Sequence, residues 1–263
     1  MRIVVFGTGG AGGYFGAQLT RAGADVVFIA RGVMGPETFV VPLQNGVEAP
    51  SQLTAALGAE HVLGGLCGTF SWVTAPGRIR SVGAGNFIKF AELDNRPSDR
   101  AEQLRRVFER AGVNVEVPSD IHKALWEKFL LVTSFGGVRA VTRAPIGIIR
   151  TIPETRRFLE QCMQEVLAVA RARRVALADT VVADTMTIVD SLAAKGTTSL
   201  QRDIADGKPS ELEFWNGAVV RLARDAEVAT PLHEFIYTLC FLRKCAREAK
   251  WSFRPELHTE QRT

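Results

Sequence analysis

The chain is poor in the residues that build metal centres and disulfide frameworks. Its 263 residues include four cysteines and four histidines, and no two cysteines form a C-x-x-C pair. No cysteine stands near a histidine at the spacing of a zinc site. We therefore expect no metal site, and we expect the cysteines to be buried free thiols in a reducing cytoplasm.

The sequence also lacks long apolar runs and dense basic blocks, and we expect no leader sequence. No apolar run approaches the roughly 20 residues that span a membrane, and the apolar residues 3–6 lead into a glycine loop instead of a cleavage site. The net charge is only +4, without a dense basic block interleaved with aromatic residues. We expect a soluble cytoplasmic protein whose partners are neither nucleic acid nor membrane.

What is present is enough apolar sequence for two domains, since 46% of the residues are hydrophobic. In residues 1–117, short apolar runs alternate with glycine turns and helical patterns, which predicts a parallel, helix-flanked sheet with an antiparallel edge. Residues 118–263 are helical in pattern. The expected strands are 2–6, 25–30, 39–43, 62–66 and a hairpin of 78–82 and 86–90 around 83–85. The expected helices are 12–22, 98–112, 119–135, 153–174, 179–194, 210–226 and 231–250.

The first strand runs directly into a glycine-rich turn that opens a helix. This G-x-G-x-x-G run consists of Gly7, Thr8, Gly9, Gly10, Ala11 and Gly12. Its glycines permit a tight turn, close approach to a pyrophosphate and close helix–strand packing, and the helix N-terminus offers unpaired N–H groups. The flanking strand and helix favour a dinucleotide site over a glycine turn without a ligand.

The end of the second strand indicates which dinucleotide binds. An NAD site usually carries an acid there, which accepts from the ribose 2′-OH. Here the sequence has no acid and instead has Arg31, which can pair with a 2′-phosphate. We expect NADP(H) as the cofactor. The alternative is that Arg31 is a solvent-exposed arginine in a loop and binds no phosphate.

A lysine interrupts the apolar stripe of the helix expected at residues 119–135. Ile121, Leu125 and Val132 lie on one face at helical spacing, and Lys128 takes the missing place in that face. A lysine there is unfavourable unless its amine reaches a cleft or a partner. It could act as a proton donor, or it could extend to the surface along its apolar stem.

Together these stretches resemble the ketopantoate reductase family, which reduces 2-dehydropantoate to pantoate with NADPH on the route to coenzyme A. The resemblance rests on the glycine loop with Arg31, the Gln44-Asn45-Gly46 turn, the Leu125-Trp126-x-Lys128 helix and the Ser199…Asp203…Glu211 spacing. It implies a Rossmann-like domain and an all-α domain of the 6-phosphogluconate dehydrogenase C-terminal type, with the active site in the cleft between them.

The resemblance also implies roles for individual residues. Lys128 would be the general acid, and Asn45 would lie beside the nicotinamide and the lysine. Glu211 would bind the hydroxyl end of the substrate, and Ser199 would lie near its carboxylate. The residues alone have plainer interpretations: Asn45 begins a turn, Glu211 starts a helix capped by Ser210, Ser199 is a loop serine, and Asp203 is structural.

Two departures from the family pattern stand out. Where the family helix carries asparagines after the lysine, this chain has Val132 and Gly136, which favours a less polar 2-oxo acid. In addition, about sixty family residues, roughly two helix–strand units, are absent after Gly32. A parallel crossover needs a dozen or more residues. We therefore expect a stretch to have been omitted, not a truncated domain, and the Cα–Cα distance across residues 32–34 would test this.

The sequence as a whole predicts an NADPH-dependent reductase of a 2-oxo acid, most simply 2-dehydropantoate. One alternative is another beta-hydroxyacid dehydrogenase that uses NAD, against which Arg31 argues. Another is a non-catalytic protein that binds NADP. The apolar faces of the helical region suit either a homodimer or an internal core, so the sequence leaves the oligomeric state open.

Overall fold

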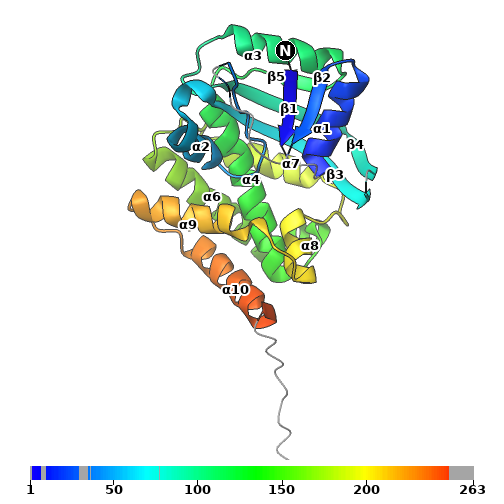
Figure 1. Cartoon of the computed structure of the whole chain (residues 1–263). Helices are drawn as coiled ribbons and strands as arrows, with labels where there is room; N and C mark the ends of the chain where they lie inside the picture. The colour runs from blue at the N-terminus through cyan, green and yellow to red at the C-terminus, as the bar shows by residue number, and fades with distance from the viewer. Residues whose placement is uncertain (1, 7–9, 30–34, 36, 77, 249–263) are drawn as a thin grey trace, which may run out of the picture. The chain divides into compact units, whose positions relative to one another are not determined.

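The chain folds into two compact units, each of which is described by itself. The computed structural model describes residues 2–6, 10–29, 35, 37–76 and 78–248 (Figure 1). The first unit comprises Met1–Leu130 and Ala170–Val181, and the second comprises Leu131–Val169 and Val182–Thr263. Every strand of the described residues belongs to the first unit. The fold is therefore an α/β Rossmann-like part followed by an all-α part, as the sequence predicts.

The chain begins with the predicted strand–helix–strand unit. Strands β1 (Arg2–Phe6) and β2 (Asp25–Ile29) pair in parallel, and α1 (Gly10–Arg21) connects them. The strand expected at 39–43 is reduced to a single parallel bridge between Val40 and Val62. Among the described residues, β1 and β2 thus form a sheet of two strands only.

A second sheet contains β3 (Leu63–Ala75), β4 (Arg78–Glu92) and β5 (Asn114–Glu116). Strand β4 pairs antiparallel with β3 and parallel with β5. The hairpin expected around residues 83–85 is wrong, because residues 78–92 form one continuous strand. Strand β3 pairs with residues 78–82 and 87–92 on either side of the glycines, with an irregularity between Gly68 and Phe70, and the chain turns instead between β3 and β4.

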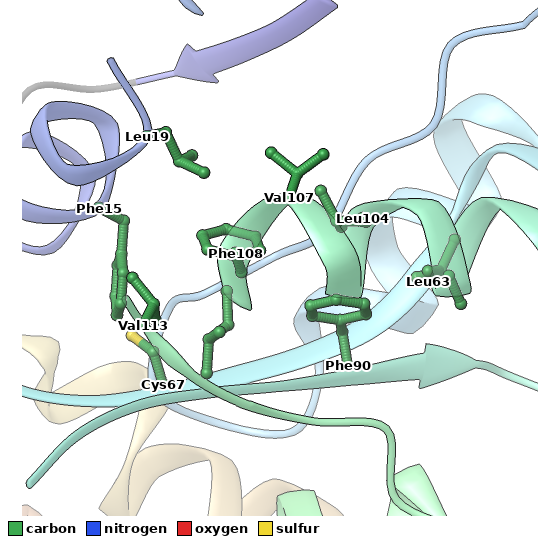
Figure 2. Close-up of a cluster of buried hydrophobic side chains, with 11 residues drawn as sticks. Phe15, Leu19, Leu63, Cys67, Phe90, Leu104, Val107, Phe108 and Val113 are labelled. Atoms are coloured by element: carbon green, nitrogen blue, oxygen red, sulfur yellow. The ribbon is translucent and has the colours of Figure 1, made fainter. Parts of the chain in front are cut away.

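The core of the first unit joins α1 to the second sheet and to α3 (Asp99–Arg110). Phe15 and Leu19 of α1 are 2% and 1% exposed. Figure 2 shows them facing Phe108 of α3, and the Phe15 and Phe108 rings meet edge to face with centroids 6.1 Å apart. Phe90 of β4 lies on the other side of Phe108. Helix α1 is therefore fixed by packing along its middle.

Helices account for most of the remaining described chain. In the order of the sequence they are α2 (Ala49–Leu57), η1 (Ala59–His61), α4 (Ile121–Thr142), α5 (Ile146–Thr151), α6 (Pro153–Ala172), α7 (Val181–Ser191), α8 (Ser199–Asp206), η2 (Glu211–Phe214), α9 (Asn216–Asp225) and α10 (Pro231–Glu248). The helices expected at 153–174, 179–194 and 231–250 are confirmed. Helix α4 runs further than expected, and α2, α5 and α8 were not expected.

The helix expected at 210–226 is broken at Trp215, whose φ of −105° and ψ of −94° separate η2 from α9. Ser210 makes no side-chain cap bond. Glu213 stands three residues after Ser210, where a capping box has its acid, but it accepts a hydrogen bond from the Tyr237 hydroxyl at 2.6 Å and pairs with Arg221. A tertiary contact thus outweighs the local capping pattern.

The N-terminus of α10 is capped from another helix. The Glu165 carboxylate of α6 accepts from the backbone N–H groups of Leu232 and His233 at 2.8 and 3.0 Å, and from the His233 ring at 2.8 Å. The buried hydroxyl of Thr230, the residue in the N-cap position, has no hydrogen-bond partner among the described residues.

Two findings bear on expected absences. No helix among the described residues has the length and apolar character to cross a bilayer. Cys67, Cys162 and Cys240 are free and buried, as expected, and burial raises the pKa of the Cys240 thiol to about 11.

Candidate active site

Two adjacent glycines on β3 bring separate segments of the first unit together. Successive residues of a strand face opposite sides of the sheet. A Cβ on Gly64 would stand 2.5 Å from Cγ1 of Ile121 in the first turn of α4, and a Cβ on Gly65 would stand 2.7 Å from the Pro42 carbonyl oxygen. Because neither position has a side chain, α4 and the segment before Asn45 can approach β3 on its two faces.

Cys67, further along β3, makes the contacts that define the site. Its thiol donates to the Leu43 carbonyl at 3.7 Å, two residues before Asn45. Its own backbone carbonyl accepts a hydrogen bond from Nζ of Lys128 at 2.5 Å. The structure thus brings the lysine of α4 and the loop that carries Asn45 to the same part of β3.

The apolar stripe predicted on α4 is present. Ile121 and Leu125 are 0% and 4% exposed and pack with Leu66 of β3, and Val47 of the Asn45 loop packs against the same cluster. Lys128 follows Leu125 on this face and is half-buried. Its amine reaches a backbone carbonyl, so the side chain is held in place inside the unit.

The predicted dinucleotide loop is only partly within the described residues. Gly7, Thr8, Gly9 and Arg31 lie outside them. Helix α1 begins at Gly10, and its first four residues carry no side chain larger than a methyl group. Helix α1 thus begins shortly after a parallel strand and has no large side chains in its first turn. A helix N-terminus of this kind can accommodate the pyrophosphate of a dinucleotide.

The two predicted substrate residues lie in the second unit. Ser199 is the first residue of α8, whose N-cap Thr198 accepts from the backbone N–H of Gln201 at 3.1 Å. Glu211 is the first residue of η2. Burial raises the pKa of the Asp203 carboxyl on α8. Ser199 and Glu211 therefore each begin a helical segment, where anions and carboxylates are favoured.

The positions of the missing family asparagines are also in this unit. Val132 is half-buried, and Gly136 is buried beneath the ring of Trp215. A Cβ at Gly136 would overlap that ring, which is itself 3% exposed. An indole thus occupies the space beside this turn of α4, and an asparagine at 136 could not fit without moving it.

Sequence reasoning missed Cys67 and Trp215. The group that Cys67 contributes is a backbone carbonyl, which has no signature in the residue type. The only signal is the Gly64-Gly65 pair that precedes it. Trp215 could have been identified only by recognising that its large ring packs against Gly136, which lies 79 positions earlier in the sequence. No group of three potential metal ligands occurs among the described residues.

Two family models match the chain. The model described as "Ketopantoate reductase PanE/ApbA C terminal" matches residues 120–242, and the one described as "Ketopantoate reductase PanE/ApbA" matches residues 3–34 and 30–95. The two segments of the second match meet at residues 30–34, at the short connection after β2.

Curated relatives and solved structures agree with this match. The uncharacterized oxidoreductase YkpB of Bacillus subtilis is 23% identical over 293 residues, which cover 90% of this chain and 97% of the relative. The 2-dehydropantoate 2-reductase of Halobacterium salinarum is 29% identical over 208 residues, covering 79% and 67%. A 2-dehydropantoate 2-reductase structure from Geobacter metallireducens is 25% identical with a TM-score of 0.85, covering 92% of this chain and 99% of that one.

The alignment with the Bacillus relative is longer than the part of this chain that it covers. Ninety per cent of 263 residues is about 237, so about 56 of the 293 aligned positions face a gap in this chain. The full sequence runs through the connection without further residues. The expectation of an omitted stretch after Gly32 stays a prediction. Residues 32–34, where the distance test applies, lie outside the described residues.

Proposed function

Because the chain belongs to the ketopantoate reductase family, we propose that it reduces the keto group of a 2-oxo acid to a hydroxyl with NADPH. The first substrate to test is 2-dehydropantoate. The observation that carries the proposal is the half-buried Lys128 amine, which the Cys67 carbonyl holds at 2.5 Å in the same unit as the glycine-opened helix α1.

Lys128 performs the acid step in this proposal. When bound, NADPH supplies the hydride. Negative charge then develops on the substrate carbonyl oxygen, and an ammonium group beside that oxygen stabilises the charge and donates a proton from Nζ. The Cys67 carbonyl orients the amine for this transfer. Asn45, on the loop joined to Cys67 through Leu43, is assigned a place beside the nicotinamide and the lysine.

The N-terminal part, residues 1–117, is assigned to the cofactor. The backbone of Gly7, Gly9 and Gly12 would receive the pyrophosphate at the start of α1, together with Thr8, Gly10 and Ala11. Arg31 would pair with the 2′-phosphate, which distinguishes NADPH from NADH. The helical part, residues 118–263, is assigned to the substrate.

Ser199 and Glu211 are the proposed substrate contacts, to the carboxylate and the hydroxyl end respectively. The surroundings of α4 favour a second candidate class. Val132 and Gly136 offer no amide, and Trp215 adds an apolar ring. A site that lacks polar partners loses its preference for a polar substrate. The alternative substrate is therefore a 2-oxo acid whose branched side chain is a plain hydrocarbon without a hydroxyl group.

Steady-state oxidation of NADPH separates these candidates. The assay compares 2-dehydropantoate with 3-methyl-2-oxobutanoate, which lacks only the hydroxymethyl group. If Glu211 binds the hydroxyl, Glu211→Ala should lower kcat/KM by about 10- to 100-fold for the first substrate alone, since a hydrogen bond to a charged group is lost.

A better kcat/KM for 3-methyl-2-oxobutanoate in the unmodified protein would favour the less polar class. Binding of NADPH without turnover of any 2-oxo acid in a wider panel would refute the proposal and leave a non-catalytic NADP-binding protein. Preferred use of NADH would favour the other beta-hydroxyacid dehydrogenases.

A further inference from the structure

A buried arginine in the second unit lacks an acidic partner. Arg139, near the end of α4, is 2% exposed. Its Nη2 donates to the Gly196 carbonyl, and its guanidinium carbon lies 5.0 Å from the centre of the Phe135 ring. Its Nε is buried and has no hydrogen-bond partner among the described residues. Arginine is almost never fully buried unless it is paired.

The charges around Arg139 make its position more unfavourable. No carboxylate of the described chain forms an ion pair with it within 4.0 Å. Burial lowers the pKa of Arg139, and the positive charge of Arg202 on α8 lowers it further. Asp203, the acid next to Arg202, forms no ion pair with Arg139 within 4.0 Å. Burial raises the pKa of its carboxyl, and the cations that lower it are Arg202 and Lys208. A buried cation thus faces a second cation.

A buried charge without a counter-ion strongly destabilises a fold. Groups of this kind persist where they serve binding or catalysis. We propose that Arg139 and Arg202 form a binding site for a small oxyanion, the carboxylate or phosphate group of a metabolite, within the helical unit.

The geometry of Arg139 suits such a ligand. The Phe135 ring and the Gly196 carbonyl fix the plane of the guanidinium, and the Nε edge is left to donate. Guanidinium edges match the two oxygens of a carboxylate or phosphate in parallel hydrogen bonds. Residues 193–197 and Arg202 are exposed. Arg202 donates to the Thr197 hydroxyl at 2.8 Å, which places it at the edge of the loop that covers Arg139.

Thermal unfolding in the presence of anions tests the site without cofactor or 2-oxo acid, so the outcome does not depend on the reductase proposal. The probes are inorganic phosphate and acetate, each titrated against sodium chloride at constant ionic strength. At ten times its Kd, a bound anion should raise Tm by about 3–6 °C. A response to phosphate alone assigns the site to phosphate groups, and a response to acetate assigns it to carboxylates.

Three variants locate the response. Arg139→Met should abolish it, and its Tm without anions should equal or exceed that of the unmodified protein, because an unpaired buried charge is removed. Arg139→Lys keeps the charge but lacks the planar edge and should weaken binding about tenfold. Arg224→Met removes a largely exposed arginine of α9 and should leave the response unchanged.

The proposal is overturned if neither anion raises Tm. It is also overturned if Arg139→Met, or Arg139→Lys should the former not fold, responds as strongly as the unmodified protein. A response that Arg224→Met reduces equally would show general screening by an adventitious ion only.

Discussion

Replacing Lys128 with methionine removes the amine and keeps an apolar stem of similar length. In the protein the amine is half-buried and donates to the Cys67 carbonyl at 2.5 Å. Losing that bond should lower the free energy of unfolding by about 1–3 kcal/mol. Since domains are typically stable by about 5–15 kcal/mol, Lys128→Met should remain folded at 25 °C.

The effect on turnover should be larger than the effect on folding. A positioned general acid contributes about 10²- to 10⁴-fold, or about 3–5 kcal/mol of transition-state stabilisation. The proton is needed only as the hydride arrives, so kcat and kcat/KM should fall together while the Kd of NADPH stays the same. Steady-state kinetics with the best 2-oxo acid of the panel and a cofactor titration measure these quantities.

Lys123 provides a matched control on the same helix. Its amine lies 3.9 Å from the Glu127 carboxylate, with its side chain 42% exposed, and Lys123→Met should retain full turnover. The reasoning fails if Lys128→Met is folded and its kcat stays within tenfold of the unmodified value. The contact with Cys67 would then be structural only.

Three further predictions concern the cofactor, pH and a helix cap. Arg31→Gln should raise the Kd of NADPH by about 10- to 100-fold and leave that of NADH unchanged, because only NADPH carries the 2′-phosphate. Hydrogen bonds from Arg100 hold the pKa of the Glu92 carboxyl below its ordinary value, so their stabilising effect is present above the unfolded pKa and is lost as the pH falls through the lowered pKa of the folded state; the amount by which Glu92→Gln lowers Tm should therefore shrink as the pH is lowered from 7 into the acid range. Glu165→Ala should lower the free energy of unfolding by about 3–5 kcal/mol, because three donors lose their acceptor, whereas its exposed neighbour Gln164→Ala should be nearly neutral.

Each of these has a contrary outcome. If Arg31→Gln lost affinity for NADPH and NADH equally, Arg31 would not be the residue that binds the 2′-phosphate. A Tm difference between Glu92→Gln and the unmodified protein that persists at low pH would mean that packing, not charge, stabilises this pair. Equal unfolding curves for the Glu165 and Gln164 variants, recorded in urea, would show that another group caps α10.

Elements whose signals are local were predictable from the sequence. The strand–helix–strand start follows from apolar runs around a glycine turn, and the α4 stripe follows from helical spacing. Elements decided by distant partners were not predictable. Residues 78–82 and 87–92 belong to one strand because both stretches pair with β3, and the N-terminus of α10 is capped by Glu165, 66 residues before Pro231.

The candidate site divides in the same way. The residue types of Lys128 and Asn45 marked them as candidate site residues in the sequence. The contact that fixes the lysine, however, comes from a backbone carbonyl. Any residue at position 67 would supply that carbonyl. What matters in the sequence is the absence of side chains at Gly64 and Gly65, which lets α4 and the Asn45 loop approach β3.

Helix α1 owes its position to more than the sheet formed by β1 and β2. A two-stranded sheet is marginally stable in water, and parallel strands normally have cover on both faces. Here β1 and β2 pair only with each other among the described residues. Helix α1, in contrast, buries Phe15 and Leu19 against α3 and the second sheet. The helix that would receive the pyrophosphate is therefore anchored by its own side chains, and the position of its N-terminus depends on this packing more than on the two-stranded sheet.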